Sequence, residues 1–350
     1  MSLAPVYLES LKQLGYTERE AEFLYIVAVH SGFFLQRQFS QYLGIAGRGP
    51  VTDFIKKAIQ RQDVREHEPD RGTQKTYHLF SRNLYSLIGK ENSRNRKTGR
   101  YGLLDKAAPR LLSLDFVLGN LDHVYLEEEA DKVEYLTVEK GISADSLPAK
   151  VFPGKGGSET RHYFVERFPI FLSGRTDVPI ANFTYIEDQL RSLQTFSSFV
   201  QRYRPLFEAL KDDFRLIFVS NSTQSFMYAR KTFAETLSPE RHGRERQELA
   251  RFFWLKRMAE EKRFKELAHK DVIEWQRGLK RYRDPEYNSQ YELWKKIGKL
   301  VGKESVHSTG DRSQQFETYL VVPHRVQPSA SDVGAAAPSD APTAAPEHSF

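Results

Sequence analysis

A short segment near the N-terminus carries side chains whose chemistry suits contact with a nucleic acid. From position 51 it reads VTDFIKKAIQ, and its apolar residues follow the i, i+3, i+4, i+7, i+8 spacing of an amphipathic helix: Val51, Phe54, Ile55, Ala58 and Ile59. The side chains left to face outward are polar: Thr52, Asp53, Lys56, Lys57 and Gln60. Ammonium groups pair with phosphate or guanine, whereas hydroxyl and amide groups hydrogen-bond to base edges. The segment therefore predicts a helix that could read a duplex, with Arg48 just before it.

The flanking sequence predicts the elements that would hold this helix. A short helix over 33–43 is stopped by Gly44, and Pro50 suits the first turn of the next helix because its missing N–H costs nothing there. Two strand-like runs follow at 63–67 and 76–80, joined by a Pro/Gly-containing turn with Arg71 and Lys75 at or beside its tip. Helix, turn, helix and a basic-tipped hairpin is the order of a winged helix-turn-helix, a module that binds DNA.

Two further helices are expected to complete the core of this unit. Residues 5–14 form one short helical pattern, and residues 18–30 form another. Thr17 and Glu20 have the spacing of a capping box ahead of the second helix. We therefore predict a winged domain over residues 1–81.

The distribution of charge also favours a polyanionic partner. The 350-residue chain has a net charge of +6, but segments 34–106 and 241–300 carry about +8 and +7, so the remainder is acidic. A basic excess concentrated on two segments suits nucleic acid better than a uniform surface would, although ordinary solvated helix faces could produce the same counts.

Composition excludes several other classes of protein. The chain contains no cysteine, so it has no disulfide framework, thiolate zinc site or cysteine nucleophile. Its first residues lack the pattern of a signal peptide, and no apolar run approaches the roughly 20 residues that span a bilayer. Histidines are scattered without metal-ligand spacing, and no phosphate-binding glycine loop or serine nucleophile motif is present. We expect a cytoplasmic protein that needs no cofactor and contacts no membrane.

The rest of the chain divides by composition into four parts. A helical linker, including the basic stretch SRNRKTGR, is predicted over 82–146, and strands followed by helix, strand and helix predict a mixed α/β domain over 147–240. Residues 241–325 have a dense basic helical pattern, and the Ala/Pro/Ser-rich residues 326–350 predict a disordered tail. The predicted fold class is therefore α+β.

The mixed domain raises the alternative of a metal-dependent nuclease with a restriction-endonuclease-like core. Such enzymes hold Mg²⁺ with an acid on one strand and a paired acid and lysine on the next. Glu187 and Asp188 end a predicted strand where acids could lie, but Gln189 follows them instead of a lysine. Glu166 lies on the preceding strand, and Lys150 stands where a first aspartate would be wanted. This set of residues is incomplete.

The layout resembles the replication-relaxation family of plasmid and mobile-element proteins. The resembling stretches are LGYTEREAEFLYIVAVHSGFFLQRQFSQYLG, TQKTYHLF, IANFTYIED, FVQRYRPLF and FRLIFVSNS, within residues 5–235. The resemblance implies a winged helix joined to a degenerate endonuclease-like domain. The family commonly shows Glu-x-Asp on the strand that here reads Tyr185-Ile186-Glu187-Asp188, so any metal role is in doubt.

These observations lead to one functional hypothesis with two alternatives. We expect sequence-specific binding of double-stranded DNA, in regulation of transcription or of plasmid or mobile-element replication, with a possible homodimer. The residues expected to contact DNA are Arg48, Thr52, Lys56, Lys57, Gln60, Arg71 and Lys75. The alternatives are the nuclease or nicking accessory and an assembly scaffold that uses the winged unit for protein contacts.

Overall fold

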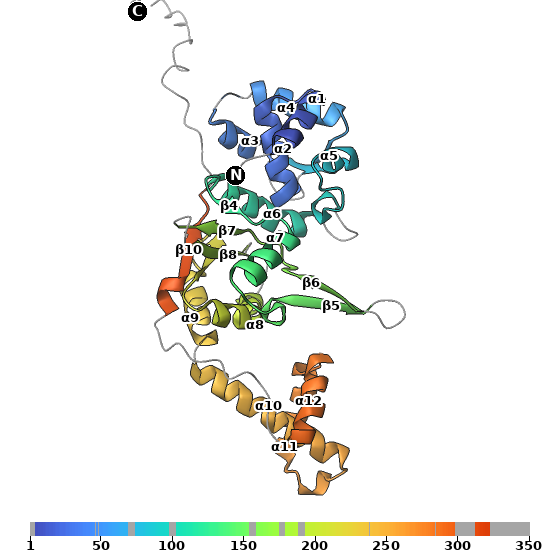
Figure 1. Cartoon of the computed structure of the whole chain (residues 1–350), viewed down its shortest axis with the longest axis vertical. Helices are drawn as coiled ribbons and strands as arrows, with labels where there is room; N and C mark the ends of the chain where they lie inside the picture. Colours follow the sequence, from blue (N-terminus) through green and yellow to red (C-terminus); the bar gives the residue numbers. More distant parts are fainter. Residues whose placement is uncertain are drawn as a thin grey trace, which may run out of the picture.

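The computed structural model describes residues 4–45, 47, 49–68, 74–97, 103–153, 159–174, 179–187, 193–237, 239–283, 285–297 and 312–322. It is an α+β protein whose parts follow one another along the long axis of the molecule (Figure 1). A mainly helical N-terminal unit is followed by a central sheet with helices on it, and a group of three helices extends from the far side. In the described part of the chain, no helix is both long and apolar enough to cross a bilayer.

The N-terminal unit combines four helices with a three-stranded antiparallel sheet. Its elements in order are α1 (Pro5–Gln13), α2 (Glu18–His30), β1 (Phe33–Leu35), α3 (Gln36–Leu43), α4 (Gly49–Gln60), β2 (Val64–His67) and β3 (Thr76–Leu79). The sheet order is β1-β3-β2. Thr17 caps α2 with the predicted capping box, and Gly44 ends α3 in the left-handed region at φ 69°.

One element of this unit differs from the prediction. The helix expected over 33–43 begins only at Gln36, because Phe33, Phe34 and Leu35 pair with His78, Tyr77 and Thr76 of β3. Phe33 and Phe34 are almost fully buried, so both neighbouring side chains of the strand are covered by protein. Because both faces of this strand are buried, its sequence does not show the alternation of apolar and polar residues that would have indicated a strand.

A helical connection joins the N-terminal unit to the central sheet. It contains α5 (Arg82–Leu87), a short 3₁₀ turn at Arg94–Arg96, α6 (Leu103–Leu118), β4 (Val124–Tyr125) and α7 (Glu129–Glu134), which continues as a π-helical turn over Tyr135–Glu139. A second 3₁₀ turn follows at Ala144–Ser146. Helix α6 lies between the two units (Figure 1), and Leu114, Phe116 and Val117 belong to a core that continues from the N-terminal unit to one face of the sheet.

The central sheet has five strands in the order β10-β9-β8-β7-β4. The strands are β7 (Ile170–Ser173), β8 (Ile180–Glu187), β9 (Phe214–Ser220) and β10 (Phe316–Leu320), with β4. Strands β8, β9 and β10 are parallel, and β7 is antiparallel to both β8 and β4. Helix α8 (Leu193–Leu210) connects β8 to β9, and α9 (Phe226–Thr236) follows β9. A separate hairpin, β5 (Ala149–Pro153) and β6 (Glu159–Tyr163), projects beside the sheet (Figure 1).

The two faces of the sheet belong to two different cores. Phe183 and Tyr185 of β8 pack with Phe196 and Phe207 of α8, whereas Ile186 belongs to the core that contains α6. Adjacent residues of a strand point to opposite faces, which explains the division. The sheet is therefore covered on both sides, and α6 packs against both the N-terminal unit and the central sheet.

The C-terminal helices form a third, smaller core. They are α10 (Pro239–Glu260), α11 (His269–Arg281) and α12 (Pro285–Ile297), with a 3₁₀ turn at Phe264–Glu266. Phe252, Phe253 and Tyr291 are buried among them. The predicted basic helical segment 241–325 needs one correction: Phe316–Leu320 is strand β10, which pairs with β9 at the edge of the central sheet. The predicted tail 326–350 lies outside the described residues.

Candidate nucleic-acid interface

Helix α4 is held in the N-terminal unit by contacts between aromatic side chains. Phe54 is fully buried, and its ring lies 4.1 Å from that of Phe39 and 6.0 Å from that of Phe23, measured between centroids. Val51, Ile55 and Ala58 are also buried, as the apolar spacing predicted. These contacts set the rotation of the helix and determine which side chains remain outside.

The outward face of α4 carries one unpaired cation and two other exposed polar groups. Asp53, Lys56 and Gln60 are exposed, and Thr52 is half-buried. Within the described residues, Lys56 makes no hydrogen bond or ion pair, so its ammonium group is available to a ligand. Ile59, predicted to face the core, is instead 36% exposed at the edge of this face. The polar side predicted from the sequence thus exists as a solvent-facing surface.

Lys57 does not share this face with Lys56. Its Nζ atom lies 2.5 Å from Glu20 Oε2 and 3.2 Å from the carbonyl oxygen of Gly15, and it lies over the Tyr16 ring at 5.3 Å from the centroid. The side chain is about one-third exposed. One residue further along a helix is about 100° of rotation, which places Lys57 on the flank toward α2. The ammonium group of Lys57 therefore pairs with a residue of another helix within the protein. This corrects the expectation that Lys57 faces outward beside Lys56.

The described residues on either side of the hairpin turn carry both signs of charge. Lys75 Nζ lies 2.6 Å from Glu66 Oε1 and 3.4 Å from Glu68 Oε1, and the bond to Glu66 raises the pKa of Lys75. Lys75 remains about half exposed. The other two predicted contacts, Arg48 and Arg71, lie outside the described residues. Lys75 is therefore already paired with acids of the hairpin, and it would have to exchange these partners to contact a phosphate.

Two arginines near α4 were missed by the sequence analysis. Arg65 on β2 is exposed and lies over the Phe80 ring at 4.7 Å from its centroid. Arg61, just after α4, is exposed, although its Nε lies 3.3 Å from Asp63 Oδ2. The signal for Arg65 was strand alternation: Val64 is buried, so the next residue of β2 points to the opposite, exposed face.

The candidate interface is held to the rest of the molecule through α3 and α6. Arg37 donates two hydrogen bonds to Asp115, one to each carboxylate oxygen, both at 2.7 Å. Gln38 Nε2 donates to Asp115 Oδ1 and to the carbonyl oxygen of Leu111, both at 2.8 Å. Asp115 is buried in this joint. The bidentate geometry restrains α3, the helix that precedes α4, against α6.

The residues considered for a nuclease site do not come together. Glu187 is buried at the end of β8, whereas Lys150 is exposed on β5, which belongs to a different sheet. Glu166 pairs with Arg202 and accepts a hydrogen bond from the Tyr203 hydroxyl at 3.4 Å. Asp188 is not among the described residues. Within the described ranges, no three His, Asp or Glu side chains lie close enough to hold a metal ion.

Comparisons with known proteins do not add to this geometry. The chain matches no protein-family model, no curated protein and no solved structure.

Proposed function

We propose that this protein binds double-stranded DNA in a sequence-specific manner through its N-terminal unit, used as a winged helix-turn-helix. The observation that carries the proposal is the order of elements: α2, β1, α3, α4, then the β2–β3 hairpin, with β1 completing a three-stranded sheet. In such modules the second helix of the pair enters the major groove and the hairpin lies along the backbone. Helix α4 would be that helix here, and its polar side faces solvent.

The side chains on the outer face of α4 suit this docking. Lys56 would pair with a phosphate or with guanine, and Gln60 and Thr52 would hydrogen-bond to base edges. Asp53 could accept a hydrogen bond from a cytosine amine. Lys75 and Arg71 of the hairpin, with Arg48 before α4, would contact the backbone. The exposed Arg65 adds a further cation on strand β2 of the hairpin.

The resemblance to replication-relaxation proteins supports a role in regulating transcription or the replication of a plasmid or mobile element. Two features of the fold agree with it: an N-terminal unit of winged-helix order, and a mixed sheet in which α8 connects the parallel strands β8 and β9. A homodimer remains part of this proposal, since paired half-sites are common for such modules.

The proposal can be tested by titrating the full chain against a labelled duplex at several salt concentrations. The variant Lys56→Ala removes a cation that makes no hydrogen bond or ion pair in the described structure, and Lys231→Ala on α9 removes an exposed lysine outside both basic segments. We expect Lys56→Ala to weaken binding and to reduce the salt slope by about one unit, because one phosphate contact is lost. Lys231→Ala should bind as the wild type does. Equal affinity of all three proteins would refute the assigned face.

Two competing functions give different results in the same assays. A metal-dependent nuclease predicts that pure protein nicks supercoiled plasmid with Mg²⁺ or Mn²⁺ and that Glu187→Ala abolishes the nicking. A protein scaffold predicts no duplex binding even at low salt. We expect salt-sensitive binding without nicking.

A further inference from the structure

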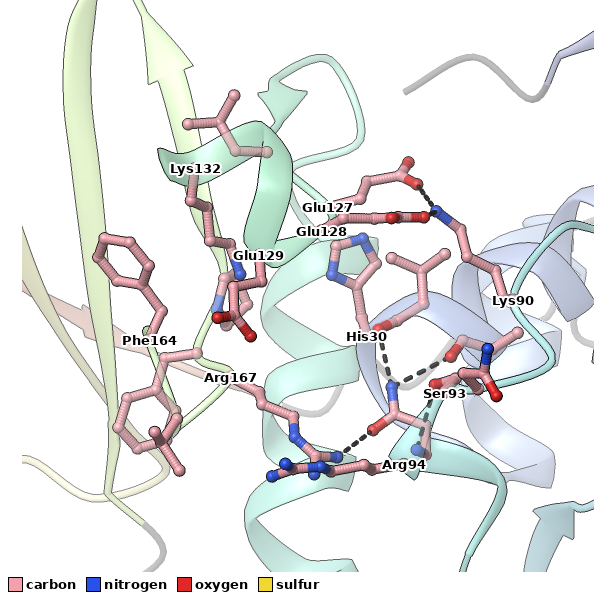
Figure 2. A pocket seen from close by; sticks show the side chains of 18 of the residues that line it. His30, Lys90, Ser93, Arg94, Glu127, Glu128, Glu129, Lys132, Phe164 and Arg167 are labelled. Atoms are coloured by element: carbon pink, nitrogen blue, oxygen red, sulfur yellow. Dashed lines mark hydrogen bonds and ion pairs between the residues drawn. The ribbon is translucent and has the colours of Figure 1, made fainter. Parts of the chain in front are cut away.

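A cavity of about 410 Å³ lies where the N-terminal unit meets the central sheet unit. One wall comes from the end of α2 and from residues 89–95, and the other comes from residues 126–132 and 162–169 (Figure 2). Its volume falls in the range of small-molecule sites, which are often found between domains. The cavity is separate from the outer face of α4 and does not depend on the DNA-binding proposal.

Lys132 places an unpartnered cation in this cavity. The residue is only 7% exposed, and in the described structure it makes no hydrogen bond or ion pair. Figure 2 shows its side chain running from α7 into the cavity. A buried lysine normally needs a counter-charge, because removal from water destabilises the ammonium ion. Burial accordingly lowers the pKa of Lys132 to about 8.

Two arginines add charge of the same sign. The guanidinium groups of Arg167 and Arg94 lie beside each other (Figure 2). Partial burial, followed by the charges of Arg110 and Arg94, lowers the pKa of Arg167 to about 10. Arg167 also occupies the left-handed region at φ 58°, which is uncommon for a non-glycine residue. Both arginine side chains keep exposed surface, so their guanidinium groups can be reached by a ligand that enters from solvent.

Arg167 is oriented by a fixed amide. Its Nη1 donates to Asn95 Oδ1 at 3.3 Å, while Asn95 Nδ2 donates to the carbonyl oxygens of Ala28 and Val29 at 3.1 and 2.8 Å. The amide is therefore anchored to the end of α2 and presents its oxygen to Arg167. This arrangement prepares the remaining guanidinium donors for a ligand and links both walls of the cavity.

Four acids line the cavity, and three of them, Glu127, Glu128 and Glu129, are bound to groups other than the three cations. Lys90 pairs with Glu127 and Glu128, and Glu127 also accepts a hydrogen bond from the Tyr25 hydroxyl at 2.6 Å. Glu129 accepts from the backbone N–H of Tyr163 at 2.8 Å and lies 3.5 Å from His162 Nδ1. These three carboxylates form no ion pair with Lys132, Arg167 or Arg94. Among the described residues, Lys132, Arg167 and Arg94 therefore make no direct ion pair, although the charges of Asp131, Glu129 and Glu127 act on Lys132 from a greater distance.

We propose that this cavity binds the phosphate group of a phosphorylated small molecule, held by Lys132, Arg167 and Arg94. The planar guanidinium group of arginine can donate two parallel hydrogen bonds, and the ammonium group of lysine is a compact charge that also donates. Phosphate oxygens accept hydrogen bonds from both. The carboxylates of Glu127–Glu129 face the same space and keep lone pairs for hydroxyl or amino groups, so the ligand carries such groups beside its phosphate. Because the walls belong to two units, the bound molecule bridges them.

The test measures thermal stability and calorimetric binding of the full chain with inorganic phosphate, pyrophosphate, adenosine monophosphate and glucose 6-phosphate, against chloride at matched ionic strength. We expect stabilisation by at least one of the organic phosphates, and the preferred one identifies the class of ligand. Lys132→Met and Arg167→Gln should each weaken that binding about ten- to hundredfold, since each removes a charge-assisted contact. The control Lys270→Met changes an exposed lysine on α11 and should leave the binding unchanged.

The Lys132→Met variant also separates a binding role from a structural one. If the lysine is retained for a ligand, its removal should raise the melting temperature of the ligand-free protein while weakening the response to the bound phosphate compound. A lowered melting temperature together with an intact phosphate response would overturn the proposal. The absence of binding by the wild type to all four probes would overturn it as well, and so would equal binding by both variants.

Discussion

The joint between α3 and α6 depends on one carboxylate, and its removal gives a quantitative test of the fold. Asp115 accepts two hydrogen bonds from Arg37 and one from Gln38, and its side chain is only 6% exposed. The variant Asp115→Ala leaves a guanidinium and an amide without this acceptor. Breaking a fully buried pair from one side costs about 3–5 kcal/mol.

The expected loss is smaller than that limit because Arg37 is 25% exposed and water can solvate part of its charge. We therefore expect the free energy of unfolding to fall by about 2–3 kcal/mol in Asp115→Ala. The double variant with Arg37→Ala should lose less than the sum of the two single changes, since the uncompensated charge is then absent.

The assay is thermal unfolding combined with hydrogen exchange of the amides in α3 and α6. For units of this size, the expected loss corresponds to a decrease in melting temperature of about 5–10 °C, with faster exchange in both helices. Glu266→Ala, which removes an acid from an exposed pair with Arg263, is the control and should leave exchange in α3 and α6 unchanged. Wild-type stability of Asp115→Ala would refute the claim that this carboxylate holds the two units together.

Three further predictions follow from local geometry. Lys57→Ala should lower the free energy of unfolding by about 1 kcal/mol through loss of the pair with Glu20, while the folded variant still binds duplex in an anisotropy titration; loss of binding with unchanged stability would contradict this. Gly278→Ala should destabilise α10 and α11 by about 1–3 kcal/mol, the opposite of the usual helix preference, because a Cβ would lie 2.1 Å from the Phe252 ring; a raised unfolding midpoint would argue against it. Burial, with the nearby lysine charges, lowers the pKa of His30 to about 3, so the unfolded chain binds a proton near pH 6.5 that the folded chain does not. Stability should therefore decrease as the pH falls from about 6.5 toward 3, less steeply in His30→Gln, and equal slopes in urea unfolding would reject the assignment.

The helices of the N-terminal unit could be predicted because their signals are local. The apolar stripe of α4 and the capping box at Thr17 each involve residues within two turns, and both agree with the structure except that Ile59 is exposed at the edge of the stripe. Strand β10 could not be predicted in the same way. Phe316–Leu320 pairs with β9 almost a hundred residues earlier, and it follows a long helical segment whose composition dominated the prediction.

The candidate site was predicted only in part for a related reason. Spacing along a helix identifies the polar side of α4, but it does not show that Lys57 reaches Glu20 on another helix. The basic stretch that contains Arg94 was assigned to a linker, and its proximity to Arg167 and Lys132 depends on how two units pack. Whether charged residues form a site or only a charged surface therefore depends on contacts between segments that are distant in the sequence.

The most direct test of the proposed DNA-binding face uses the absence of cysteine from the chain. A single cysteine introduced as Gln60→Cys on α4, or as Lys231→Cys on α9, can be labelled with a photoreactive group and irradiated with a pool of random duplexes. We predict crosslinks from position 60 that enrich a common sequence, and little crosslinking from position 231. Equal crosslinking from both positions, or none from position 60, would contradict the account.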